Sequence, residues 1–181
     1  MLERVVEVKL RIPGGALESV RRTLKERCRL VQTVTQKDVL YQVPQGLLKL
    51  RQSQPGQKEL IWYERPDVAG LKLAVSKRFY TDQPDQLHAV LEAALPIKAS
   101  LTKERCFYDF EGVEIHLDNV PGLGFFLEVE IRLEADAPEP PAQARITEAQ
   151  RTLGFVGFPV ERATYSAMLE AKRNADQRSA S

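Results

Sequence analysis

The chain has 181 residues, of which 43% are hydrophobic and 28% charged, with a formal net charge of +1. These values are typical of one globular domain and exclude a disordered chain. No stretch approaches the ~18 apolar residues of a membrane-spanning helix, and the N-terminus passes directly into a strand pattern, so we expect no secretory signal. Two cysteines without metal-ligand spacing, Cys28 and Cys106, fit a reducing compartment, and we expect a cytoplasmic protein.

The first predicted element is a strand over residues 4–12. Its stretch VEVKLRI alternates apolar side chains with Glu7, Lys9 and Arg11. Because side chains of a strand point alternately to opposite faces, this strand has one apolar and one charged face. After the break at Pro13-Gly14-Gly15, apolar residues at helical spacing predict a helix within residues 15–31.

The rest of the chain continues without a linker or a repeat. Strands are predicted over 33–42, 46–53, 58–65 and 71–80, a helix over 84–95, strands over 100–109, 112–118 and 125–133, and helices within 138–155 and 160–173. Residues 1–173 therefore form one domain, and the small polar residues 174–181 predict a frayed tail. Consecutive strands with short turns imply antiparallel pairing in an α+β fold, and roughly eight strands can close into a barrel.

Charged faces recur along these strands. The basic members are Lys49 and Arg51 in one strand, Arg78 in another, and Lys103 and Arg105 in a third; the acidic members are Asp118, Glu128 and Glu130. A flat sheet would expose these side chains to water, whereas a closed sheet would gather them around a lumen. The alternation alone leaves both arrangements open. A lumen would need a counter-charge, because unpaired buried ions are costly.

If the sheet closes, this mixture of basic and acidic side chains suits the binding of phosphate and of a metal ion. Arginine binds phosphate oxygens bidentately, and lysine binds them as a point charge. Glu128 and Glu130 are two residues apart, so both carboxylates project together, as ligands of Mg²⁺ or Mn²⁺ must. A metal with a basic clamp suits phosphoryl transfer. His116 shares the face of Asp118, but a lone histidine is more often a structural hydrogen-bonding group.

The order of these motifs resembles the CYTH domains, or triphosphate tunnel metalloenzymes, over nearly the whole chain. Their first strand carries ExExK, often followed by Arg, and Glu7, Lys9 and Arg11 match its later positions while Val5 stands where the first Glu is expected. The further matches are Lys49-Leu50-Arg51, Arg65-Pro66, Lys103-Glu104-Arg105 and Glu128-Val129-Glu130. The run IHLDNVPGLGFFLEVE, residues 115–130, is especially similar to the class IV adenylyl cyclase branch.

The resemblance implies an eight-stranded antiparallel tunnel that holds a divalent cation, Mg²⁺ or Mn²⁺, and a triphosphate substrate. The implied metal ligands are Glu7, Asp118, Glu128 and Glu130, and the implied catalytic residues are Glu7, Lys9, Glu128 and Glu130. The phosphate contacts would be Lys9, Arg11, Lys49, Arg51, Arg65, Arg78, Lys103 and Arg105.

Three functions remain after this comparison. The first is metal-dependent hydrolysis of inorganic triphosphate or of a small organic or nucleoside triphosphate. The second is cyclisation of ATP to cyclic AMP and pyrophosphate, and the third is binding of polyphosphate without turnover, which Val5 makes admissible. The expected partner is a small triphosphate. Nucleic acid is not expected, because the basic residues are dispersed over inward strand faces, and neither is a membrane.

Overall fold

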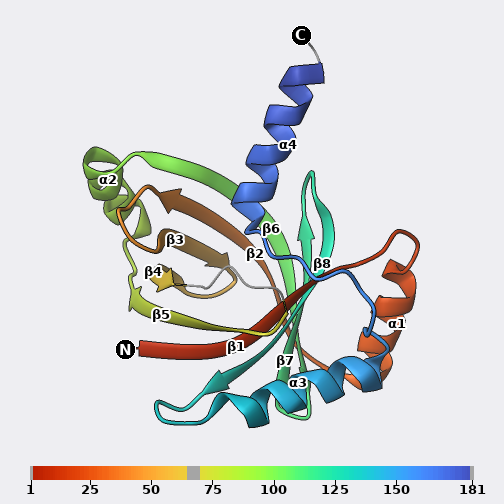
Figure 1. Ribbon diagram of the computed structural model, residues 1–181. Helices are drawn as coiled ribbons and strands as arrows, with labels where there is room; N and C mark the ends of the chain where they lie inside the picture. Colours follow the sequence, from red (N-terminus) through yellow and green to blue (C-terminus); the bar gives the residue numbers. More distant parts are fainter. Residues whose placement is uncertain (1, 65–69, 180–181) are drawn as a thin grey trace.

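The computed structural model describes residues 2–64 and 70–179, and within them eight strands form a closed barrel with helices packed outside (Figure 1). The strands are β1 (Leu2–Arg11), β2 (Arg29–Tyr41), β3 (Leu47–Gln54), β4 (Lys58–Glu64), β5 (Lys72–Tyr80), β6 (Ile97–Phe110), β7 (Val113–Val120) and β8 (Gly124–Leu133). They pair antiparallel in the order β1-β5-β4-β3-β2-β6-β7-β8, and β8 returns to β1. The predicted α+β barrel is confirmed.

The helices are α1 (Leu17–Arg27), α2 (Pro84–Ala94), α3 (Glu139–Leu153) and α4 (Tyr165–Ser179). Two of their bounds differ from the prediction. α1 ends at Arg27 because β2 pairs with β6 from Arg29 onward, so residues 29–31 are strand rather than helix. α4 continues into residues 174–179, for which the sequence predicts a frayed tail, since no glycine or proline interrupts it. Among the described residues, no helix is long and apolar enough to cross a membrane.

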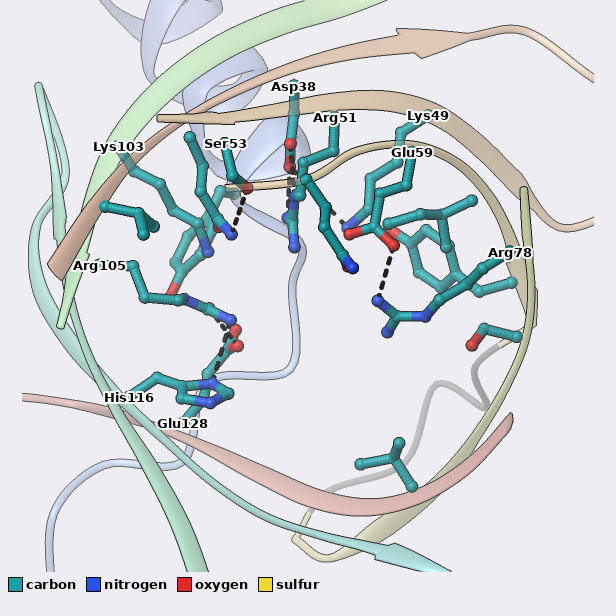
Figure 2. A pocket seen from close by; sticks show the side chains of 18 of the residues that line it. Asp38, Lys49, Arg51, Ser53, Glu59, Arg78, Lys103, Arg105, His116 and Glu128 are labelled. Carbon is teal, nitrogen blue, oxygen red and sulfur yellow. Dashed lines mark hydrogen bonds and ion pairs between the residues drawn. The ribbon is translucent and has the colours of Figure 1, made fainter. Parts of the chain in front are cut away.

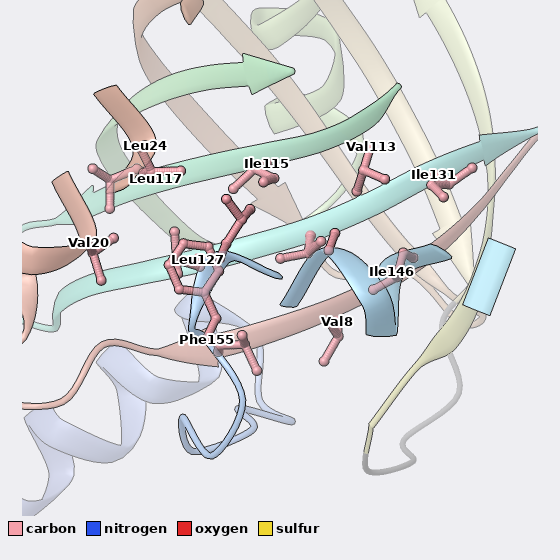
Figure 3. Close-up of a cluster of buried hydrophobic side chains, with 14 of the residues drawn as sticks. Val8, Val20, Leu24, Val113, Ile115, Leu117, Leu127, Ile131, Ile146 and Phe155 are labelled. Carbon is pink, nitrogen blue, oxygen red and sulfur yellow. The ribbon is translucent and has the colours of Figure 1, made fainter. Parts of the chain in front are cut away.

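The main apolar core lies outside the barrel wall (Figure 3). Outward side chains of β1, β7 and β8, such as Ile115 and Leu127, pack against Val20 and Leu24 of α1 and Ile146 of α3. All five are at most 2% exposed, and each contributes about 1.5–3 kcal/mol by its burial. A second apolar cluster packs α2 against β2, β3 and β4. Because the helices cover the apolar strand faces from outside, the charged faces turn into the barrel.

One end of the barrel is closed by the chain that leads into α4. The pairing of β1 with β5 stops at Glu7, and beyond it residues 159–161 take the place beside β1. The Arg11 amide donates to the carbonyl of Pro159 (2.8 Å), and the Glu161 amide donates to the carbonyl of Lys9 (2.9 Å). This pairing places the start of α4 beside β6 and β8 (Figure 1), where Tyr165 packs against Val120 and Phe126.

Candidate active site

The barrel encloses a cavity of about 290 Å³. At one end its lining is exposed to solvent: this rim consists of Gln32, Gly56, Gln57, Tyr80 and Arg132. At the other end the lining is formed by residues 164–166 at the start of α4, where Tyr165 and Ser166 are buried. The cavity is therefore a pocket with one open end and one closed end.

Both Lys-x-Arg motifs of the sequence line this cavity, and each is held by an aspartate on the neighbouring strand; Figure 2 shows the pair of Arg51 and Asp38. Arg51 donates two hydrogen bonds to Asp38, from Nε to Oδ1 (2.7 Å) and from Nη2 to Oδ2 (2.6 Å). Arg105 donates in the same way to Asp118, with both bonds 2.6 Å long. Such bidentate pairs fix the plane of the guanidinium group. The two arginines are thus set in position before any ligand arrives.

The lysine of each motif lies beside the same aspartate. Lys49 Nζ is 3.8 Å from Asp38 Oδ2, and Lys103 Nζ donates to Asp118 Oδ2 at 2.9 Å. Burial and the adjacent Arg51 lower the pKa of Lys49 to about 7, and burial together with Arg105 lowers the pKa of Lys103 to about 8. Each motif sets one lysine and one arginine beside a single aspartate, so the cations outnumber the anions here, as in an anion site.

A fifth cation, Lys9, lies near the closed end. Its Nζ donates to the carbonyl of Ala163 (3.1 Å), lies 3.7 Å from Glu128 Oε1 and is 4.1 Å from the ring centre of Tyr165. Glu128 also accepts a hydrogen bond from Arg105. Burial opposes ionisation of Glu128, but Arg105, Lys103 and Lys9 outweigh burial and hold its pKa well below the ordinary value. Glu128 is thus a permanent anion within the basic wall.

Three carboxylates form a row across β1, β8 and β7. Glu7 lies directly opposite Glu130, and Glu130 lies opposite Glu114 on its other side. Cross-strand neighbours have Cβ atoms about 4.5–5.5 Å apart, and like charges in such pairs repel. Glu7 and Glu130 both line the cavity. A bound cation would relieve the repulsion, so this acidic row fits a divalent metal.

Glu130 also belongs to a second group of potential ligands. One ligand atom each from Glu114, His116 and Glu130 lie within 4.8 Å of one another. However, Arg105 Nη1 is 3.0 Å from His116 Nδ1 and can only donate, which places the ring proton on Nε2, 3.4 Å from Glu114 Oε2. Glu114 also accepts from Arg132 (2.9 Å). These contacts engage His116 and Glu114, so Glu7 and Glu130 are the better metal ligands of the acidic row.

The structure brings most of the expected site residues together. The cavity lining contains Glu7, Lys9, Lys49, Arg51, Arg78, Lys103, Arg105, Glu128 and Glu130. Val5, where the family pattern has Glu, lines the cavity too. Arg78 pairs with Glu59 (3.0 Å) and Glu3 (2.7 Å). Arg65 lies outside the described residues.

Two expected site residues lie elsewhere. Asp118 is on the inward face of β7, as His116 is, but it is fully buried beyond the cavity lining, where Lys103, Arg105 and the hydroxyl of Tyr165 (2.8 Å) donate to it. Arg11 lies at the closed end, paired with Glu161 (3.0 Å) and stacked over the ring of Phe126. In this arrangement Asp118 orients the cations, and Arg11 fastens the segment that leads into α4.

Sequence reasoning missed Asp38, Glu59 and Tyr165. Asp38 shares the inward face of β2 with Val34, Gln36 and Leu40, so no charged alternation marks it. Glu59 follows Lys58 in β4, where charged and apolar residues do not alternate regularly, so the sequence does not indicate which of them points inward. Tyr165 comes from a helix rather than from a strand, so strand alternation does not mark it.

The fold and site define a barrel protein with an inward-facing anion site and an acidic row. The chain matches the family model described as "CYTH domain" over residues 3–173, and it belongs to this family. No curated protein matches it.

Solved structures with the same fold cover most of the chain. A conserved hypothetical protein from Pyrococcus furiosus is 26% identical, with a TM-score of 0.75, and covers 90% of this chain and 98% of its own. The PH1012 protein from Pyrococcus horikoshii is 22% identical with a TM-score of 0.76 and the same coverages. A Vibrio parahaemolyticus protein provisionally named an adenylate cyclase is 19% identical, with a TM-score of 0.72 and coverages of 92% and 97%.

Proposed function

We propose that the protein is a divalent-metal-dependent hydrolase of triphosphates. The observation that carries this proposal is the pair of Lys-x-Arg motifs, each fixed by a buried aspartate, on the wall of a cavity that also contains the acidic row. In phosphoryl transfer, positioning and charge neutralisation supply most of the catalysis. The positioned basic side chains and their positive charge are in place before a substrate binds.

The basic residues bind and orient the phosphates. Arg51 and Arg105 keep one guanidinium edge on aspartate, and Lys9, Lys49 and Lys103 add point charges. Because residues 164–166 close the far end, a substrate enters phosphates first, and any organic group remains toward the open rim.

The metal ligands we propose are Glu7, Glu128 and Glu130. Glu7 and Glu130 face each other, and Glu128 is one strand repeat away on the same face. Carboxylate oxygens suit Mg²⁺ and Mn²⁺, and such an ion neutralises phosphate charge when it is bound. Asp118 is not part of this set, because Lys103, Arg105 and Tyr165 occupy its oxygens.

The size of the cavity favours a small substrate. Sites for small organic ligands usually enclose about 300–1,000 Å³, and this cavity, at about 290 Å³, lies just below that range. Inorganic triphosphate or the phosphates of an ester fit this description. Water attacks the terminal phosphorus, the bond to the bridging oxygen breaks, and the products are orthophosphate and pyrophosphate or a diphosphate ester.

Cyclisation of ATP is the second candidate. Residues 115–130 are similar to the class IV adenylyl cyclase branch, and the Vibrio relative is provisionally named for this activity. In that reaction the ribose 3′-hydroxyl attacks the α-phosphorus, and pyrophosphate leaves. The same basic residues would hold the phosphates, while adenine and ribose would lie toward the rim.

Product analysis on a panel of substrates tests the proposal. Wild-type protein is incubated with inorganic triphosphate, ATP and a second nucleoside triphosphate, each with Mg²⁺ or Mn²⁺. Orthophosphate release supports hydrolysis, whereas cyclic AMP with pyrophosphate from ATP alone would replace it with cyclisation. Tight binding without any product would make the chain a polyphosphate-binding module, with Val5 as the first position to restore to Glu.

A further inference from the structure

Tyr165, the first residue of α4, contacts two lysines, an aspartate and a phenylalanine at the closed end of the cavity. Its hydroxyl donates to Asp118 Oδ2 at 2.8 Å. Its ring centre is 4.1 Å from Lys9 Nζ and 5.0 Å from Lys103 Nζ, and its ring meets the Phe126 ring edge-on at 5.0 Å. The side chain is 7% exposed and lines the closed end of the cavity.

The ring and the hydroxyl do different things there. An ammonium group within about 6 Å of an aromatic centre is attracted to the face of the ring, more strongly where water is excluded. The ring therefore attracts two lysines that come from different strands, β1 and β6. The hydroxyl supplies Asp118 with a donor that carries no formal charge, in addition to Lys103 and Arg105. Tyr165 thus contacts two lysines from different strands and the aspartate that fixes Arg105.

A side chain that only closed this end of the cavity by apolar packing would not need these contacts. The other apolar members of the cluster, Val120, Leu101, Leu123 and Met168, also pack at this end. Any large apolar side chain at position 165 would pack with them. Only an aromatic ring can attract the lysines, and only a hydroxyl can donate to Asp118.

We propose that Tyr165 is a positioning residue for the triphosphate: its ring holds Lys9 and Lys103, and its hydroxyl holds Asp118, which fixes Arg105, so that these three cations meet the phosphates in register. The inference rests on the proposed function. It also makes α4 part of the binding site rather than a cover over it, since the backbone carbonyl of Ala163, just before α4, accepts from Lys9 as well.

Two substitutions separate the ring from the hydroxyl. Tyr165→Phe keeps the ring, and Tyr165→Met keeps an apolar side chain of similar reach without a π face. Binding of inorganic triphosphate is measured by calorimetry in metal-free buffer at pH 7, with thermal melts to confirm folding. We expect the dissociation constant to rise about threefold in Tyr165→Phe and about tenfold further in Tyr165→Met. Leu123→Ala, in the same cluster, is the control and should leave binding unchanged, because Leu123 contacts Arg11 only through its carbonyl.

A double-mutant cycle with Lys9→Met makes the test specific. If the ring acts through Lys9, the loss caused by Tyr165→Met shrinks when Lys9 is absent; a purely structural role predicts additive losses. Equal binding by Tyr165→Phe and Tyr165→Met would overturn the role of the ring, and wild-type binding by Tyr165→Phe would overturn the role of the hydroxyl. If Tyr165→Met fails to fold, Tyr165→Leu replaces it. Wild-type protein that binds no triphosphate, either in metal-free buffer or with Mg²⁺ present, would contradict the proposed function itself.

Discussion

Glu7 and Glu130 lie directly opposite each other on β1 and β8, and both carboxylates face the cavity. Two like charges in such a pair repel. The chain also places Glu114 on the far side of Glu130. Arg132 donates to Glu114 (2.9 Å) and lies 4.0 Å from Glu130, so part of this negative charge is offset, and a cation bound by Glu7 and Glu130 would reduce the repulsion between them.

The acidic row predicts a metal-dependent melting temperature. Because Mg²⁺ or Mn²⁺ binds the folded chain, either ion should raise the melting temperature of the wild type with increasing concentration. Glu130→Gln should lose most of this increase, while its metal-free melting temperature stays equal or rises. The check is differential scanning calorimetry over a metal titration, with Glu26→Gln on the exposed face of α1 as the control. An undiminished increase in Glu130→Gln would contradict the assignment of Glu130.

Asp118 is predicted to act on stability and cation geometry rather than on the metal. Asp118→Asn leaves Lys103 and Arg105 without their buried counter-charge, and breaking such pairs costs about 3–5 kcal/mol. Urea unfolding should show a loss of this size in the free energy of unfolding. Metal affinity of the folded variant should stay close to that of the wild type. A selective loss of metal binding with unchanged stability would instead make Asp118 a metal ligand.

Arg51 should be irreplaceable by lysine. Arg51→Lys keeps the charge but cannot bind Asp38 through two parallel hydrogen bonds, so the cation is no longer fixed. We expect the KM for triphosphate to rise about tenfold. Steady-state kinetics check this, with Arg22→Lys on the exposed surface of α1 as the matched control. An unaltered KM would mean that Arg51 does not contact the substrate.

The lowered pKa of Lys49 predicts that the binding of triphosphate depends on pH. Its pKa of about 7 in the free protein means that most of its charge is lost by pH 9, whereas bound phosphates favour the protonated form. Binding therefore takes up a proton, and the dissociation constant for triphosphate should increase as the pH rises from 7 to 9. In Lys49→Arg, which stays charged, this contribution disappears.

Calorimetry in buffers of different ionisation enthalpy measures the proton uptake directly. Proton uptake that is the same for wild type and Lys49→Arg comes from ionisation of the triphosphate itself. Lys77→Arg, on the outer face of β5, is the control for a lysine-to-arginine substitution. Identical pH profiles for wild type and Lys49→Arg would show that Lys49 does not titrate on binding.

Strand alternation predicts which charged side chains share a face, whereas closure of the sheet into a barrel is expected from the family resemblance. Lys9 and Lys49 alternate with apolar residues in their strands, and the amphipathic helices indicate which face must be covered. This reasoning works because successive side chains of a strand alternate between its two faces, so a shift of one residue would move every side chain to the opposite face.

The closed end could not be predicted in the same way. Arg11 follows the alternation of β1, yet it lies beside Glu161 because residues 159–161 pair with the end of that strand. Tyr165 reaches the cavity only through this nonlocal pairing. Asp38 was hidden among apolar neighbours, and its importance appears only once Arg51 is seen opposite it. Contacts between distant segments, rather than local pattern, determine these roles.

The central claim is tested most directly by following inorganic triphosphate with ³¹P nuclear magnetic resonance in the presence of Mg²⁺. The account predicts that wild-type protein converts it to pyrophosphate and orthophosphate in equal amounts. The folded double variant Glu128→Gln/Glu130→Gln should leave triphosphate intact. Intact triphosphate with the wild type, or equal conversion by the double variant, would contradict the account.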